Sequence, residues 1–447
     1  MSESAAKPRV LLVCHNHPDL LVGGVEIYVR DLYDALKGSA EFEPLLLARA
    51  GLPFSPTDKF HDAPLTMVNR DPNQYVLYTD FGDFDHFYGK LATSKSVLTE
   101  YFGEFLAAQS PDVVHFQHTA YLGYDMVRVA KNTLPEVPIA YSLHEYMPIC
   151  NRDGVMVRAT NESLCEEESP RRCHECFPGI TPQDFYMRKR FIQSHLALVD
   201  LFIAPSEYVK ERYLQWGLPA EKIVVEPQGI LQPEVTADEI ERKTGETRER
   251  RDRFAYFGQL NPHKGADVLL SAMDVLGEEF EGRLWLYGAN LDKQSLEWQR
   301  RFGALAEKER KNVTFVGNYR RSDLAKLMAR IDWVVVPSNW WETGPLVVWE
   351  AFQHGRPVIC SDIGGQSEKI TDGVNGLLFK RKDAEDLARA MKIAAETPGL
   401  WEELRAGIPD RPGHAMEDHV ATMSRLYLGL LEQRRTATEP FERVRSA

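Results

Sequence analysis

The chain has 447 residues, of which 43% are hydrophobic and 27% are charged, and its formal net charge at pH 7 is −13. This length predicts two domains, and the composition is typical of a globular protein. The negative charge argues against nucleic-acid binding, which requires a basic surface, and no stretch approaches the roughly 20 apolar residues that span a bilayer. The apolar run Val10–Val13 is too short for a signal peptide. We therefore expect a cytoplasmic protein with at most peripheral contact with the inner face of a membrane.

In the first half of the chain, short apolar runs alternate with helical patterns, which predicts a parallel sheet covered by helices. A helix is expected at Gly24–Leu36, and the aromatic-rich stretch Tyr75–Tyr88 is interpreted as a loop on the acceptor side or a lid loop. The expected strands are Arg9–Cys14, Pro44–Ala48, Val113–Phe116, Ile139–Leu143, Leu201–Ala204 and Ile223–Val225.

A second series follows the charged stretch Thr236–Arg253, which we interpret as an interdomain linker or an exposed entry to a second domain. Its expected strands are Phe254–Phe257, Arg283–Tyr287, Val313–Val316, Trp333–Val336 and Val358–Cys360, and its helices are Ala266–Leu276, Arg321–Arg330, Pro345–His354 and Ala384–Glu396. The predicted fold is α/β, with two facing Rossmann-like domains (1–232 and 233–412) and a deep cleft between them. The remainder, 413–447, should form a last helix at about His414–Arg434 that packs back on the first domain.

In open α/β sheets, ligands bind beyond the carboxyl ends of the strands. The run Val334–Ala351 predicts a buried strand, a loop, and a helix with Pro345 at its first position. The first N–H groups of that helix can bind a phosphate or a sugar hydroxyl, and Glu342 and Glu350 can both face such a ligand. Alternatively, Glu350 is a solvated helix residue and Glu342 only stabilises the helix dipole. A second glycine turn, Gly364–Gly365, favours a composite pocket.

The segment 334–379 resembles the donor signature of retaining glycosyltransferase family 4, of the bacterial type with a cysteine-containing insertion in the first domain. Members of this family have the GT-B fold. The resemblance covers most of the chain and rests on several motifs: Ser338 to Glu342, Glu350, Gly364–Gly365, Asp372–Phe379, Gly23–Glu26, Phe257–Gly265, Gly288 and Val316–Tyr319.

The resemblance implies a role for each matching residue in donor binding. Lys264 neutralises the diphosphate as the leaving charge develops, aided by Gln259, where the family often has an arginine. Glu342 holds the donor sugar's hydroxyls and Glu350 the ribose. Residues implied to contact the rest of the donor are Gly23, Gly24, Gly288, Tyr319, Ser338, Thr343, Gly344, Pro345 and Leu346.

Histidines at the ends of two strands add candidate catalytic residues in the first domain. His118 and His144 both fall at the carboxyl end of a predicted strand, whereas His115 is expected to face the sheet as a core residue. In similar enzymes, histidines at these places contact the donor sugar or phosphate. The spacing leaves open whether Gln117 or His118 takes that role.

The resemblance implies a retaining hexosyltransferase, for example in polysaccharide biosynthesis, that uses a UDP-, GDP- or ADP-sugar. The acceptor is a glycan, a lipid-linked molecule or a small molecule. The donor phosphate receives the acceptor proton, so neither a pair of catalytic carboxylates nor a catalytic metal or other cofactor is required. The alternatives are a catalytically silent nucleotide-sugar-binding scaffold and a GT-B nucleotide-sugar epimerase.

Four of the six cysteines lie within a short insertion: Cys150, Cys165, Cys173 and Cys176. Because disulfides are disfavoured in the cytoplasm, four clustered thiols favour a structural zinc ion. The wide first spacing and the single CxxC leave two alternatives open, which are a redox-active pair and four reduced thiols.

Overall fold

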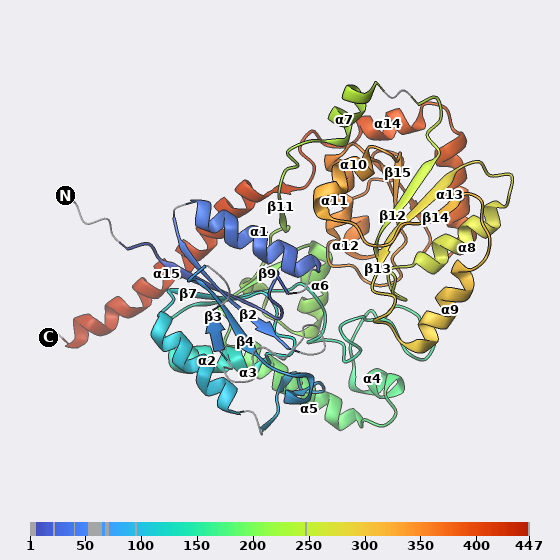
Figure 1. The fold of residues 1–447 in the computed structure, drawn as a ribbon. Coiled ribbons are helices and arrows are strands. Elements are labelled where there is room, and N and C mark those ends of the chain that lie inside the picture. Colours follow the sequence, from blue (N-terminus) through green and yellow to red (C-terminus); the bar gives the residue numbers. More distant parts are fainter. Residues whose placement is uncertain are drawn as a thin grey trace. The chain divides into compact units, whose positions relative to one another are not determined.

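The computed structural model describes residues 6–20, 23–39, 41–51, 65–67, 71–93, 96–245 and 248–445, with side chains as far as residue 436 except those of 65–67 and 81. Two compact units make up the chain (Figure 1). The first unit contains residues 1–230 and 414–447, and the second contains Leu231–Gly413. The sequence predicted these boundaries near 232 and 412.

The first unit is built on an eight-stranded sheet with the order β10-β9-β8-β7-β1-β2-β4-β3. Its pairs are parallel except for β3 with β4. The strands are β1 (Arg9–Cys14), β2 (Glu43–Ala50), β3 (Leu65–Met67), β4 (Gln74–Tyr78), β7 (Val113–Phe116), β8 (Ile139–Ser142), β9 (Leu201–Ala204) and β10 (Ile223–Val225). Two small pairs join β5 (Phe84–Asp85) to β6 (Lys90–Leu91) and β11 (Gly229–Ile230) to β18 (His414–Ala415).

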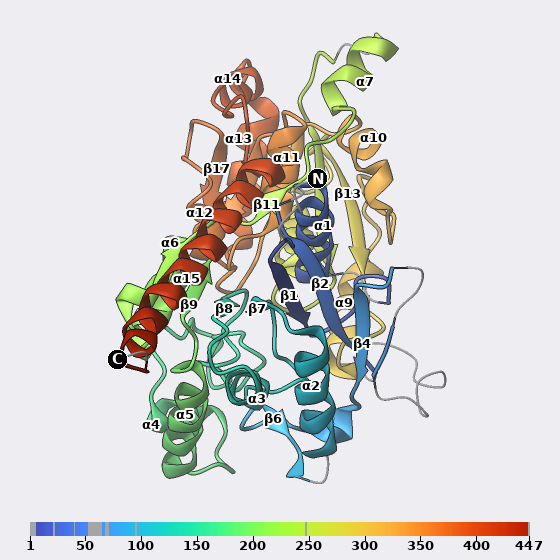
Figure 2. The same ribbon diagram turned by 90° about the vertical axis from the view of Figure 1, so that its left-hand side faces the viewer.

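Helices α1 and α15 pack together in this unit, although they lie at opposite ends of the chain (Figures 1 and 2). Tyr28 and Leu32 of α1 share one buried cluster with Val420 and Tyr427 of α15. The helices of the unit are α1 (Gly24–Ser39), α2 (Ser96–Gln109), α3 (Asp125–Thr133), α4 (Pro170–Cys176), α5 (Pro182–Leu196), α6 (Glu207–Trp216) and α15 (Met416–Arg445).

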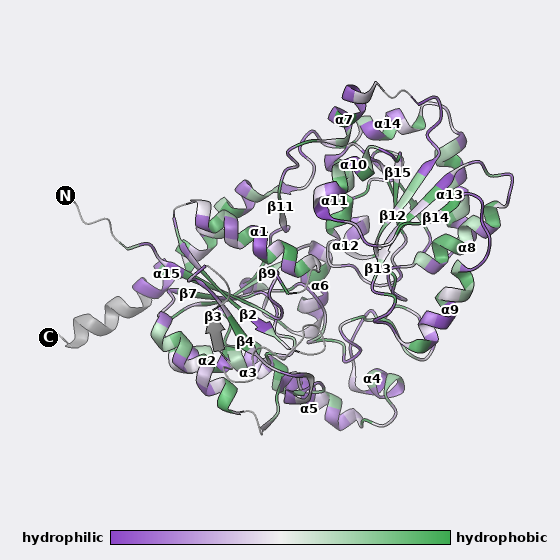
Figure 3. Cartoon of the chain, viewed as in Figure 1, coloured by the Kyte–Doolittle hydropathy of each residue, from purple (hydrophilic) through white to green (hydrophobic). Residues whose placement is uncertain are grey.

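The second unit is built on a parallel six-stranded sheet with the order β14-β13-β12-β15-β16-β17. Its strands are β12 (Arg253–Gln259), β13 (Arg283–Ala289), β14 (Val313–Phe315), β15 (Trp333–Val336), β16 (Val358–Ser361) and β17 (Gly376–Phe379). Its helices are α7 (Ala237–Thr244), α8 (Ala266–Leu276), α9 (Leu296–Ala306), α10 (Leu324–Met328), α11 (Leu346–Gln353), α12 (Gly364–Ser367), α13 (Ala384–Glu396) and α14 (Leu400–Ala406). Figure 3 shows hydrophobic residues along the central strands β12 and β15 and both kinds of residue along the helices, as burial on both faces of a parallel sheet requires.

The predicted class, two Rossmann-like α/β units, is confirmed. The stretch predicted as a linker or an exposed entry to the second domain contains α7, which is capped by Thr236 and Glu239 and anchored by the fully buried Arg356, whose guanidinium contacts Glu241 at 2.6 Å. This stretch lies at the start of the second unit, so the linker alternative was wrong. A second local prediction was also wrong. The stretch predicted as a loop begins with strand β4, which pairs in parallel with β2. In the part of the chain that the structure describes, no helix has the length and apolar character needed to cross a membrane.

Candidate functional site

The loop between β15 and α11 holds a buried carboxylate bound by three donors. Oε1 of Glu342 accepts hydrogen bonds from Nζ of Lys264 at 2.7 Å, from Oγ of Ser338 at 2.7 Å and from the indole N–H of Trp340 at 2.8 Å. Burial raises the pKa of Glu342, but the charge of Lys264 and these hydrogen bonds hold it below its ordinary value. The side chain is therefore an ionised carboxylate that is buried from solvent.

The loop that carries Lys264 is pressed against the Glu342 loop. The N–H of Asn339 donates to the carbonyl of His263 at 2.6 Å. Gly265 has a φ of 73°, and a Cβ atom there would lie 1.8 Å from the carbonyl oxygen of Pro337. Only glycine allows this approach, so Gly265 sets the distance between the Lys264 and Glu342 loops.

The second glycine turn supports the Glu342 loop from behind. The N–H of Gly365 donates to the carbonyl of Glu342 at 2.8 Å, and a Cβ at this glycine would lie 2.5 Å from the carbonyl of Thr343. Ser361 donates to the carbonyl of Ser338 at 2.6 Å, which ties the end of β16 to the same loop. The composite arrangement of the two turns is therefore present.

Helix α11 begins one residue later than predicted. Pro345 is the N-cap, and Leu346 is the first helical residue. The partly buried residues Thr343 and Gly344 lead into this N-terminus, whose first N–H groups have no partner inside the helix. The loop therefore offers backbone donors beside Glu342.

Glu350 and Tyr319 are close enough to interact, because the charge of Glu350 contributes to raising the pKa of the Tyr319 hydroxyl, after burial. Tyr319 also packs edge-on against Phe257 and Tyr287, which stack with ring centroids 4.7 Å apart. Phe257 lies in β12, Tyr287 lies in β13, and Tyr319 follows β14, so the cluster joins three neighbouring strands of the sheet.

Gln259 and Gly288 complete the predicted donor set of the second unit. Gln259 is exposed at the end of β12, and its side-chain oxygen accepts a hydrogen bond from Asn261 at 3.3 Å. A Cβ atom at Gly288 would lie 2.5 Å from the side chain of Leu260. The absence of a side chain at Gly288 therefore allows Leu260 to pack closely against the end of β13.

Two residues of this site were not found from the sequence. Trp340 lies in the motif from Ser338 to Glu342, and its indole N–H is a hydrogen-bond donor that could have indicated a contact with Glu342. Lys369 donates to the carbonyl of Pro345 at 3.0 Å, and burial lowers its pKa to about 7. A lysine five residues after Gly364 carries no sequence signal, because only the fold brings it to the start of α11.

In the first unit, the glycine turn leads to a buried acid. Gly23 and Gly24 precede Glu26, whose carboxylate contacts His15 at 3.1 Å and accepts a hydrogen bond from Asn16 at 3.0 Å. Burial lowers the pKa of His15, but its contacts with Cys14 and Glu26 raise it to about 10. His15, Asn16 and Glu26 were missed as site residues, although they lie directly after β1 and within the quoted glycine motif.

The predicted histidines form two groups. The ring of His118 packs against that of His15, with centroids 4.0 Å apart and the ring planes tilted by 32°. His144 lies between two glutamines, contacting Gln117 at 2.9 Å and Gln228 at 2.8 Å, and burial lowers its pKa to about 3. Gln117 is fully buried, whereas 8% of His118 is exposed. Burial also lowers the pKa of His118 well below its ordinary value, so both predicted histidines are neutral, hydrogen-bonded rings at strand ends.

His115 is a buried core residue, as predicted. Its ring nitrogens contact Tyr427 at 2.8 Å and Ser142 at 2.9 Å.

The four clustered cysteines are free thiols on the loop after β8 and on α4. Burial and the neighbouring thiols raise the pKa values of Cys150 and Cys165, the latter to about 11. Among the described residues, no three of these sulfur atoms come within 4.8 Å of one another. Four thiolates are suitable ligands for zinc, but the four sulfur atoms would have to move closer to one another to bind the ion.

Comparison with known families covers both units. Residues 22–230 match the family described as Glycosyltransferase Family 4, and residues 237–408 match Glycosyl transferases group 1. The chain is a family 4 glycosyltransferase. Its expected family and GT-B fold class are thereby confirmed.

This chain spans only part of the length of the two D-inositol 3-phosphate glycosyltransferases that it matches. A D-inositol 3-phosphate glycosyltransferase of Jonesia denitrificans is 30% identical over 38% of this chain and 41% of its own length. Another, from Kribbella flavida, is 28% identical over 68% of this chain and 66% of its own length. A solved sucrose-phosphate synthase from Thermosynechococcus elongatus is similar with a TM-score of 0.71 and 20% identity, covering 96% of this chain and all of its own. Anabaena HepE, solved with UDP and glucose, gives a TM-score of 0.61 at 17% identity, covering 93% of this chain and 98% of its own.

Proposed function

We propose that this glycosyltransferase moves a hexose, with retention of configuration, from a nucleotide-diphosphate sugar to a glycan, lipid-linked or small-molecule acceptor. The observation that carries the proposal is the ionised Glu342, with one oxygen held by Lys264, Ser338 and Trp340 beside the start of α11. A positive charge, a carboxylate and backbone donors at one helix N-terminus suit a sugar diphosphate.

In the proposed reaction, the bond between the anomeric carbon and the phosphate oxygen breaks, and the acceptor oxygen bonds to that carbon on the same face. The acceptor proton passes to the departing phosphate. Lys264 stabilises the charge that develops on this phosphate, Glu342 orients the sugar hydroxyls, and Glu350 binds the ribose. His118 and His144 are proposed to contact the sugar or phosphate. No metal or other cofactor takes part.

The nucleotide is proposed as UDP, GDP or ADP. A solved relative of this fold contains UDP and glucose, and another contains ADP and acarbose. The reaction takes place in the cytoplasm, with the acceptor supplied from solution or from the membrane surface.

The test incubates the chain with UDP-, GDP- and ADP-hexoses, with and without lipid-linked and glycan acceptors, and identifies every product by mass spectrometry. A new glycoside whose anomeric configuration matches the donor's supports the proposal. An isomerised donor indicates the epimerase alternative. Tight binding of a nucleotide sugar without turnover with any acceptor class indicates a silent scaffold. A glycoside of inverted configuration overturns the retaining mechanism.

The four clustered cysteines are proposed to bind one structural zinc ion that orders the insertion. Cys173 and Cys176 on α4 would supply two ligands, and Cys150 and Cys165 the other two. Four thiolates fill a tetrahedral shell and leave no position for substrate, so such an ion would be structural and not catalytic.

A further inference from the structure

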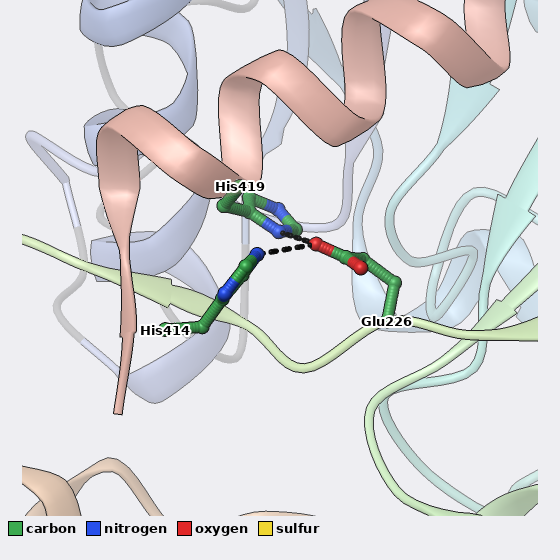
Figure 4. Close-up of side chains that lie close together, drawn as sticks. All are labelled: Glu226, His414 and His419. Carbon is green, nitrogen blue, oxygen red and sulfur yellow. Dashed lines mark hydrogen bonds and ion pairs between the residues drawn. The ribbon is translucent and has the colours of Figure 1, made fainter. Parts of the chain in front are cut away.

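A second group of metal-ligating side chains lies far from the donor loops in the sequence. Glu226 follows β10, His414 lies in β18 and His419 lies near the start of α15 (Figure 4). Their ligand atoms all lie within 4.8 Å of one another, and no other such group occurs among the residues that the structure describes. The three side chains come from the segments that leave and re-enter the first unit.

The three side chains converge on one point. Oε1 of Glu226 is 2.8 Å from Nε2 of His414 and 2.8 Å from Nδ1 of His419, as Figure 4 shows. Nε2 of His414 is shielded from solvent and makes no hydrogen bond among the described residues, because the geometry of its contact with Glu226 is poor. A buried imidazole nitrogen is thus aimed at a carboxylate without a proper hydrogen bond.

The ring of His419 is fixed from its other side. Its Nε2 lies 2.8 Å from the hydroxyl of Tyr28 on α1, and a Cβ atom at Gly229 would lie 2.7 to 3.0 Å from its side chain. A tyrosine hydroxyl can donate or accept, so His419 can give up its Nδ1 proton and keep this bond. Histidines that ligate metals are typically oriented by such a partner on the second nitrogen.

We propose that Glu226, His414 and His419 bind a divalent transition-metal ion of the zinc type. Two imidazole nitrogens and a carboxylate oxygen are the ligands this ion class prefers, whereas calcium and magnesium require mainly oxygen ligands. Ligand atoms around a tetrahedral zinc lie about 3.3 Å apart, so the pairs now at 2.8 Å need to separate only slightly. His414, with 28% of its side chain exposed, has room to shift and offers an entry path.

Such an ion would cross-link two chain segments that already pair through β11 and β18. It would fix the start of α15 to the end of β10 in the first unit. The proposal is independent of the transfer reaction, because none of these residues belongs to the donor site described above.

The test is a cobalt(II) titration of the full chain, followed by its visible d–d absorption and by metal analysis after gel filtration. Four proteins are compared: the unaltered chain, His414→Ala, Glu226→Gln, and His86→Ala, which removes an exposed histidine of the same unit. The expected result is one equivalent of cobalt less in His414→Ala and in Glu226→Gln than in the unaltered chain and His86→Ala. The lost absorption should contain no thiolate-to-cobalt charge-transfer band.

Equal cobalt stoichiometry in all four proteins, whatever its value, would overturn the proposal. Because His414 is partly exposed and glutamine matches glutamate in size, both variants should fold, which circular dichroism checks. A third variant, Tyr28→Phe, should keep the stoichiometry but weaken binding about 10-fold, because it removes only the partner that orients His419. An unchanged affinity in Tyr28→Phe would contradict the role assigned to His419.

Discussion

The ammonium nitrogen of Lys264 lies 2.7 Å from Oε1 of Glu342 and joins two loops that are 78 residues apart in the sequence. The contact keeps Glu342 ionised although it is buried, and it keeps the lysine near the start of α11. A sugar diphosphate offers its phosphate charge to Lys264 and its hydroxyls to Glu342. The pair can therefore exchange its mutual contact for contacts with the donor.

Glu342→Gln and Lys264→Ala should each abolish most sugar transfer while the fold remains intact. Each removes a charge that the proposed transition state uses, and the loss of one such contact typically costs about 3–4 kcal/mol, or two to three decades in rate. The measurement is kcat at saturating donor, together with circular dichroism of each variant.

Matched controls for these variants lie on α13, where Glu396 and Lys392 are exposed. Glu396→Gln and Lys392→Ala should keep the parental kcat. Near-parental turnover in Glu342→Gln or Lys264→Ala would show that the site is assigned to the wrong residues.

Gly265→Ala should destabilise the second unit and weaken donor binding more than Gly245→Ala does. The two glycines have similar backbone angles (φ 73°, ψ 19° and φ 66°, ψ 17°), so alanine suffers about 1–2 kcal/mol of left-handed strain at either. Only at Gly265 would the new Cβ also collide with a neighbour, the carbonyl of Pro337. Thermal unfolding and nucleotide-sugar affinity measure the difference. Equal effects of the two substitutions would mean that the close approach of the Lys264 and Glu342 loops contributes neither to stability nor to donor binding.

Some of the buried strands could be predicted from the sequence with the correct bounds, and others were predicted with ends that differ by one or two residues. Arg9–Cys14, Val113–Phe116 and Trp333–Val336 agree residue by residue, because strands covered on both faces are continuous apolar runs. Helix α7 was not predicted, since it has few apolar residues and is held by Arg356, more than a hundred residues away. The capping box of Thr236 and Glu239 was the local signal for it. Local pattern contains no information on such a partner.

The donor loops were predictable for a different reason. The motifs that carry Lys264 and Glu342 resemble those of family 4, and this resemblance implied a role in donor binding for each residue. It did not predict the contact between the two side chains. The contribution of Lys369 and the contact between the rings of His15 and His118 depend on loops that follow different strands. Only the order of strands in the two sheets brings these residues together.

Acidification should destabilise the first unit between about pH 6.5 and 3. Burial lowers the pKa of His115 to about 3 from 6.5, so the unfolded chain binds one more proton than the folded chain in this window. Stability therefore falls as the pH decreases through it, by up to about 1.4 kcal/mol per pH unit for this group, and is independent of the group at higher pH. Urea unfolding followed at pH 7, 6 and 5 measures the slope.

His115→Asn should flatten this dependence, because the variant lacks the group that takes up the proton. His86→Asn removes an exposed histidine and should retain the parental slope. If His115→Asn unfolds with the same pH dependence as the parent, His115 does not contribute to the acid sensitivity.

The last prediction concerns the four cysteines of the insertion. With cobalt(II), the parent chain should show a thiolate-to-cobalt charge-transfer band, and Cys173→Ser/Cys176→Ser should lose it together with one metal equivalent. The sulfur atoms stand too far apart for binding without movement, so the metal must draw Cys150 and Cys165 toward α4 and order the segment between them. His414→Ala is the control, because it should keep the band while losing the other proposed metal. The double variant should lose acceptor use more than nucleotide-sugar binding, since the donor loops belong to the second unit. A parent chain that shows no charge-transfer band at saturating cobalt would exclude the thiolate site.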